Sequence, residues 1–110
     1  MISDLSLINI LNAQGVKGAV VKNGVLKTCT TVPNSLTIPK GIRRLETHAL
    51  AGHNNLGHLI ISDTVESVGN FVLVNCPNLR LIECHTNLKS YEELLRYGNL
   101  SEVSYVYSRR

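Results

Sequence analysis

Residues 36–58 read LTIPKGIRRLETHALAGHNNLGH, and residues 59–81 read LIISDTVESVGNFVLVNCPNLRL. The two segments align without a gap, and seven columns are apolar in both copies. The pairs are Leu36/Leu59, Ile38/Ile61, Ile42/Val65, Leu45/Val68, Ala49/Val72, Leu50/Leu73 and Leu56/Leu79, and Asn55 also aligns with Asn78. Self-similarity at a fixed period is typical of proteins in which each unit buries its apolar face against the next. The sequence therefore predicts a solenoid.

The repeat weakens on both sides of these two copies. A further forward shift of 23 residues keeps five columns apolar, but Arg96 and Glu102 break the other two. The five are Ile82, Cys84, Leu88, Tyr91 and Leu95. A backward shift does not fit, because Leu45 then falls on Lys22. We expect the array to begin near residue 36, with repeats at 36–58 and 59–81 and a degenerate copy afterwards.

The flanking segments have the signals of caps, which a short array needs because its end units would otherwise expose core. Residues 3–13 predict a helix with Ser3 as its N-cap, and Asn23-Gly24 predicts a hairpin between 16–21 and 25–29. Residues 1–35 thus form the expected N-terminal cap. Residues 82–110 form the C-terminal one, with a capping box at Ser90 and Glu93 and a last strand in EVSYVYS.

The repeat resembles the BspA-type leucine-rich repeat, whose pattern is I-P-x-x-V-x-x-I-G-x-x-A-F-x-x-C-x-x-L. The matching positions are Ile38-Pro39, Ile42, Leu45, Ala49-Leu50 and Leu56, then Ile61, Val65, Val68-Gly69, Val72-Leu73, Cys76 and Leu79. The resemblance covers residues 24–95, with leucine in place of phenylalanine in both copies and His53 in place of the first cysteine. It implies an α/β fold: a curved right-handed solenoid of two to three 23-residue repeats, with one short parallel strand per repeat. It also implies a general role in protein recognition.

Composition bounds the class of protein. The chain has 110 residues, 44% of them apolar and 17% charged, which fits a single compact domain rather than a disordered tail. No apolar run approaches the length of a membrane span, and Asp4 stands where a signal peptide needs basic residues. Three cysteines at irregular spacing do not form a disulfide framework. We expect a cytoplasmic protein, of a size that would suit a compact inhibitor carried by a virus or mobile element.

Metal binding and catalysis are the first chemical hypotheses. His53 and Cys76 occupy one repeat column, so a solenoid would stack these two possible zinc ligands about 5 Å apart. Cys84 instead falls in a buried strand column and His85 in a turn column, and a repeat cysteine is commonly a small buried hydrophobe. No catalytic motif or phosphate-binding loop is present in the sequence. We expect no enzyme activity, metal or cofactor.

Nucleic-acid binding is the alternative function, because residues 1–55 carry six basic and two acidic side chains. Its candidate residues are Lys40, Arg43 and Arg44, with lysines at 17, 22 and 27 nearby. Their columns in the next repeat hold Asp63, Glu66 and Ser67, so a basic groove would not persist along the array. These residues can equally be solvated turn residues.

Protein binding has two candidate surfaces. The first is the outward face of the strands, with columns Ser35/His58/Leu81 and Thr37/Ile60/Glu83. Exposed strands of repeat proteins form binding surfaces, although isoleucine is also simply a good strand former.

The second surface lies on the turns that follow the strands. Phe71 and Val74, three apart on an expected short helical turn, should share an outward face with their repeat equivalents Leu94 and Tyr97. All four tyrosines, Tyr91, Tyr97, Tyr105 and Tyr107, lie near the C-terminus, and tyrosine is enriched at interfaces. The alternative is that these residues form the core of a cap. The sequence thus favours an adaptor or inhibitor that binds another protein, or a second copy of itself, and neither spans nor binds a membrane.

Overall fold

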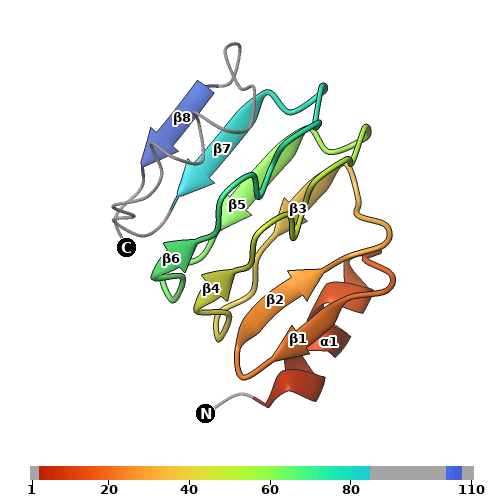
Figure 1. Cartoon of the computed structure of the whole chain (residues 1–110), viewed down its shortest axis with the longest axis vertical. Helices are drawn as coiled ribbons and strands as arrows, with labels where there is room; N and C mark the ends of the chain where they lie inside the picture. The colour runs from red at the N-terminus through yellow and green to blue at the C-terminus, as the bar shows by residue number, and fades with distance from the viewer. Residues whose placement is uncertain (1–2, 85–103, 108–110) are drawn as a thin grey trace.

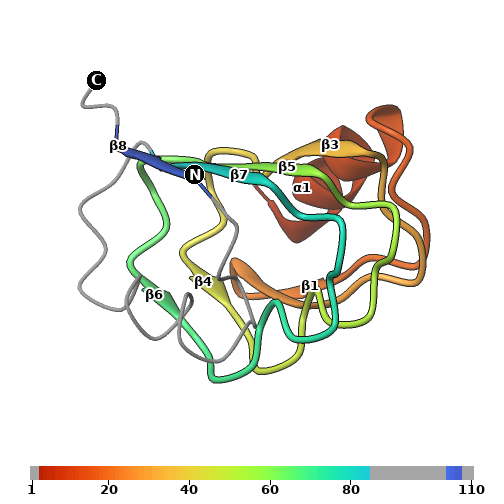
Figure 2. The same ribbon diagram turned by 90° about the horizontal axis from the view of Figure 1, so that it is seen from above.

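The computed structural model describes residues 3–84 and the backbone of residues 104–107. In chain order the elements are α1 (Asp4–Ala13), β1 (Val20–Lys22), β2 (Val25–Thr28), β3 (Ser35–Thr37), β4 (Arg44–Leu45), β5 (His58–Ile61), β6 (Ser67–Val68), β7 (Leu81–Cys84) and β8 (Ser104–Tyr107). In this part of the chain the strands form two four-stranded sheets, with the orders β1-β2-β4-β6 and β3-β5-β7-β8 (Figure 1). Figure 2 shows the sheets as two layers, with α1 at the end where the chain begins. The predicted α/β class is confirmed.

Equivalent strands of successive repeats lie side by side and run parallel. In the sheet β3-β5-β7-β8, Leu36 pairs with Leu59, Leu59 with Ile82, and Ile82 with Tyr105. Each step is 23 residues along the chain, and β4 and β6 keep the same offset. The strand expected in the C-terminal tail is present as β8 and continues the register. Each apolar column of the alignment is therefore a continuous row of side chains.

The apolar rows form the core between the two sheets. All seven aligned pairs are buried in both copies, with no side chain more than 5% exposed. They belong to one cluster that also includes Leu7 and Leu11 of α1 and Leu26 of β2. Burying a leucine or isoleucine side chain contributes about 1.5–3 kcal/mol, so these rows supply the main stabilising term.

The turns between strands are held by hydrogen bonds from one repeat to the next. The amides of Leu50 and Gly52 donate to the carbonyls of Val72 and Val74 at 3.0 and 2.9 Å. Side chains bridge the same step, since Asn55 Nδ2 donates to the carbonyl of Val32 at 2.7 Å. Polar backbone groups without a ladder partner are thus satisfied by the neighbouring repeat.

Each repeat contains a second strand, so the expectation of one parallel strand per repeat is wrong. β4 and β6 are two residues long, and in each a half-buried residue, Arg44 or Ser67, precedes a buried one. The second strand forms because the segment crosses back under the first sheet and there meets its equivalent in the next repeat. The amide of Gly69, for example, donates to the carbonyl of Leu45 at 2.7 Å.

The array also begins before residue 36, which corrects the predicted boundary. β2 pairs with β4 in parallel, with Leu26 beside Leu45, an offset of 19 residues rather than 23. A fixed shift of 23 compares Leu45 with Lys22 and so misses this strand. The hairpin that delivers β2 is as predicted, because Asn23 and Gly24 both have positive φ, at 54° and 74°.

Three side chains join the N-terminal elements to the repeats. Ser3 is the N-cap of α1 and its hydroxyl accepts from the amide of Ser6 at 3.1 Å, as predicted. Gln14 pairs with the edge of β3: Nε2 donates to the carbonyl of Thr37 at 2.8 Å, and Oε1 accepts from its amide at 2.9 Å. Asp4 accepts hydrogen bonds from both residues of the hairpin turn. The helix predicted around Ser90 and Glu93 lies outside the described residues.

Substitution of Gly69 by alanine tests how closely the repeats approach. A Cβ there would lie 2.4 Å from the amide nitrogen and 2.8 Å from the Cα of Thr47, so backbone would have to move. We expect Gly69→Ala to lower the free energy of unfolding by about 1–3 kcal/mol in urea titrations. Gly57→Ala is the control, because its Cβ would meet first the Asn34 side chain, at 3.2 Å. Equal losses for the two variants would contradict this account of Gly69.

Substitution of Asp4 by asparagine tests the contact between helix and hairpin. Hydrogen bonds from the amides of Gly24 and Asn23 lower the pKa of Asp4 below its ordinary value of 3.8. Its carboxylate therefore stabilises the fold fully above that value, and the contribution is lost as pH falls through the lower folded pKa. Thermal unfolding should show Asp4→Asn less stable than wild type at neutral pH, with the gap closing in acid. A gap that does not depend on pH would contradict the prediction.

Candidate protein-binding surfaces

The first candidate surface is the outward face of the sheet β3-β5-β7-β8. Alternation along the strands buries Leu59 and Ile61 and turns His58 and Ile60 outward, where both are half-buried. The register sets Ile60 between Thr37 and Glu83, and His58 between Ser35 and Leu81. The structure thus brings together the four predicted residues of this face, which we call the sheet surface: His58, Ile60, Leu81 and Glu83.

His58 contributes to the sheet surface in a limited way. Its Nε2 is buried and has no hydrogen-bond partner within residues 3–84. An approaching protein would meet the edge of the imidazole rather than this nitrogen. Ile60 and Leu81, which are diagonal neighbours across β5 and β7, are the apolar part of the surface.

The second candidate surface lies on the turns after β4 and β6. Phe71 is 41% exposed, and its ring stacks on that of His48 with 5.7 Å between centroids and 14° between planes. The two residues occupy one repeat column. We call Phe71, His48 and the half-buried Val74 the turn surface.

The expected helical turn at Phe71 and Val74 is wrong in its conformation. The amide of Val74 donates to the carbonyl of Phe71 at 3.2 Å, but Phe71 has φ of 57° and His48 has φ of 62°, both in the left-handed region. Such a conformation is unusual for a bulky residue and costs about 1–3 kcal/mol. It directs the two rings along the same side of the molecule, where they stack.

Several predicted residues cannot be assigned to either surface. Leu94 and Tyr97, and also Tyr91, lie outside the described residues. Tyr105 and Tyr107 lie in β8, where the structure describes the backbone alone. His48 was not among the predicted site residues, although its alignment with Phe71 was a signal that could have found it.

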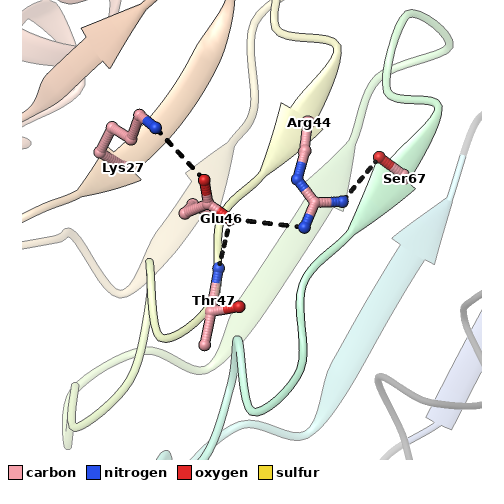
Figure 3. A network of polar contacts seen from close by, with 5 residues as sticks. All are labelled: Lys27, Arg44, Glu46, Thr47 and Ser67. Atoms are coloured by element: carbon pink, nitrogen blue, oxygen red, sulfur yellow. Dashed lines mark hydrogen bonds and ion pairs between the residues drawn. The ribbon is translucent and has the colours of Figure 1, made fainter.

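The basic residues of the N-terminal half are largely engaged within the protein. Glu46 contacts both Lys27 Nζ, at 3.3 Å, and an Arg44 guanidinium nitrogen, at 3.4 Å, and Arg44 also donates to Ser67 (Figure 3). The amide of Thr47 and then Lys27 lower the pKa of Glu46, so this carboxylate stays ionised and offsets the nearby positive charge. Sequence reasoning missed Glu46, because only the pairing of β2 with β4 brings it to Lys27.

The other two candidates for nucleic-acid binding are also engaged. Lys40 Nζ lies 3.7 Å from a carboxylate oxygen of Asp63, and Arg43 Nε donates to the carbonyl of Asn23 at 2.9 Å. Nothing in this arrangement favours a groove for phosphates over turn residues that bind one another.

The cysteines and His53 pack as core and turn residues. The thiol of Cys76 donates to the carbonyl of Leu50 at 3.1 Å, and burial raises its pKa despite hydrogen bonds from the backbone of His53 and Gly52. Burial lowers the pKa of His53, which also hydrogen-bonds the backbone of Cys29. Within residues 3–84 and 104–107, no group of three or more His, Cys, Asp or Glu residues could hold a metal ion. Cys84 lies in the buried strand column, as predicted, and His85 lies outside the described residues.

Membrane contact was also considered. In the described residues, no helix is both long enough and apolar enough to cross a bilayer.

Comparison with known proteins gives one result. A family model described as BspA type leucine rich repeat region (6 copies) matches residues 19–107. The match begins before residue 36 and so includes the strand β2 that the fixed repeat length had missed. Neither the curated proteins nor the solved structures gave a match.

Thiol reactivity tests the environment of the cysteines. All three are buried, and burial raises the pKa of Cys29 from 9.0 to about 11, which lowers its thiolate fraction about a hundredfold. In the native protein we expect a disulfide reagent such as DTNB to react far more slowly than with free cysteine. Three thiols should react quickly once guanidinium unfolds the chain. A native thiol as fast as free cysteine would contradict this prediction.

Proposed function

Because the chain belongs to the BspA-type leucine-rich repeat family, we propose that it is a non-catalytic module that binds another protein through its sheet surface or its turn surface. Leucine-rich repeats generally mediate protein–protein interaction and are generally non-catalytic. The single observation that carries the proposal is this family match over residues 19–107. An adaptor or an inhibitor acting in the cytoplasm would both fit such a module.

The form proposed for the array is a short solenoid with an N-terminal cap. The constant offset of 23 residues in β3, β5, β7 and β8 supports it, since a solenoid repeats one step between units. A capping role for α1 and the hairpin is supported by Gln14, whose amide takes both backbone groups of Thr37 at the edge of β3. An edge closed in this way does not add further strands.

The sheet surface supports protein binding through its apolar centre. Ile60 and Leu81 are half-buried on an outward face whose other described side chains are polar or charged. Apolar residues within a polar rim are the arrangement found at the centre of protein interfaces. Their diagonal spacing, roughly 7–8 Å between Cα atoms, lets one partner segment contact both.

The turn surface supports binding through its aromatic ring. Phe71 is the single phenylalanine of the chain and is 41% exposed, although its repeat column can hold a histidine. Large aromatic side chains supply most of the energy in many interfaces. A second copy of the chain is one candidate for the protein that covers it.

Affinity capture with surface variants tests the proposal. Wild type, Ile60→Asp and Phe71→Asp would each be used as bait in extracts of the cells that express the protein. A carboxylate in a desolvated interface costs several kcal/mol, so we expect one of the two variants to lose a partner that wild type retains, by a hundredfold or more in affinity. Light scattering of the purified chain would identify a homodimer.

The matched control is Leu5→Asp, which adds the same charge at a 67% exposed apolar residue of α1, away from both surfaces. It should retain the partner, and all variants should keep the thermal stability expected of folded protein. If Ile60→Asp and Phe71→Asp both fold and retain every partner, the choice of surfaces is wrong. If the wild type instead captures nucleic acid, with an affinity that falls steeply as salt is added, the protein-binding proposal is wrong.

A further inference from the structure

A hollow of about 230 Å³ lies on the outward face where β3 and β5 end. One wall is formed by residues 37–40, which are the end of β3 and the turn after it, and the other by Ile60, Ser62 and Asp63. Equivalent columns of two adjacent repeats therefore face each other across it. The sheet surface meets the hollow at Ile60.

The polar groups that line the hollow are already hydrogen-bonded within the protein. The amide of Ile38 donates to the carbonyl of Ile60 at 2.8 Å, and the hydroxyl of Ser62 donates to the carbonyl of Pro39 at 3.2 Å. Both backbone groups of Thr37 bind the side chain of Gln14. What these walls offer to a ligand is mainly the apolar surface of Ile60 and Pro39.

The size of the hollow restricts its occupant. Cavities for drug-sized ligands and cofactors are typically about 300–1,000 Å³, whereas a cavity of about 150 Å³ already holds a benzene ring. A volume of 230 Å³ is therefore small for a cofactor and sufficient for one leucine, isoleucine or phenylalanine side chain.

The rim carries one positive and one negative group. Lys40 Nζ and Asp63 Oδ2 are 3.7 Å apart, and their side chains are 73% and 37% exposed. An ammonium beside a carboxylate complements a peptide group, because the first can donate to a carbonyl and the second can accept from an N–H. An apolar floor below such a rim matches an apolar residue within a peptide chain.

We propose that this hollow receives one apolar side chain of the partner protein, whose flanking peptide groups contact Lys40 and Asp63. The inference rests on the proposed protein-binding function and identifies the chemistry of its anchor. The partner segment crosses the strands rather than extending the sheet at β3, since Gln14 occupies both backbone groups of Thr37 on that edge.

Chemical-shift titrations of the ¹⁵N-labelled full chain test the hollow without a known partner. The probes are N-acetyl-leucinamide and N-acetyl-phenylalaninamide, with N-acetyl-glycinamide as the probe that lacks a side chain. We expect the apolar probes to shift the amides of Thr37, Lys40, Ser62 and Asp63 in a saturable way, and the glycine probe to leave them unchanged. Uniform small shifts over the whole chain, or equal shifts with the glycine probe, would overturn the proposal.

Two variants of matched charge complete the experiment. Ile60→Glu places a carboxylate on the wall and should raise the half-saturating concentration about tenfold or more, whereas Leu81→Glu places it on the same sheet face outside the lining and should not. Retained binding in Ile60→Glu would overturn the proposal. Shifts of the same amides on dilution without probe would also overturn it, since a second copy would then be the occupant.

The outcome for the hollow is independent of the outcome of affinity capture. If the apolar probes bind there but wild-type bait retains no protein, the hollow exists as a site and the proposed protein-binding function fails. If Ile60→Asp loses a captured protein but no probe binds, the sheet surface acts without this anchor and the inference alone fails.

Discussion

Each 23-residue repeat lays its strands and turns against the equivalent segments of the preceding repeat, and the hydrogen bonds between them determine where every other residue can lie. The step is visible in the strand register from Leu36 through Leu59 to Ile82, and in the turn contact from Leu50 to Val72. A repeat of different length would offset the apolar rows and leave turn amides unsatisfied. Gly69, which lies directly against the backbone of Thr47, shows how little space that step allows.

The N-terminal end of the array is where the constant step no longer applies. The hairpin joins the second sheet with an offset of 19 residues, and side chains rather than a further strand satisfy the edge of β3. Asp4 and Gln14, near the two ends of α1, make these contacts with the hairpin turn and with Thr37. The helix is thus attached by specific polar contacts as well as by the burial of its apolar residues.

The same constraint explains where variation is tolerated. Columns that point into the core hold leucine, isoleucine or valine in both copies, whereas outward columns change freely, as with Thr37, Ile60 and Glu83. The stacked His48 and Phe71 occupy such a variable column, and so does the pair Lys40 and Asp63. A recognition surface can therefore be built from these columns without disturbing the packing that supports it.

The sequence by itself determined the period, the buried columns, the hairpin turn at Asn23-Gly24 and the outward position of Ile60, because each depends on spacing along one chain. It did not predict β4 and β6, the left-handed conformation of Phe71 or the pairing of Lys27 with Glu46. The hollow beside Ile60 was equally invisible. These features arose only in the tertiary structure, because they depend on distances between side chains and backbone of different repeats, which the order of residues within one repeat does not specify.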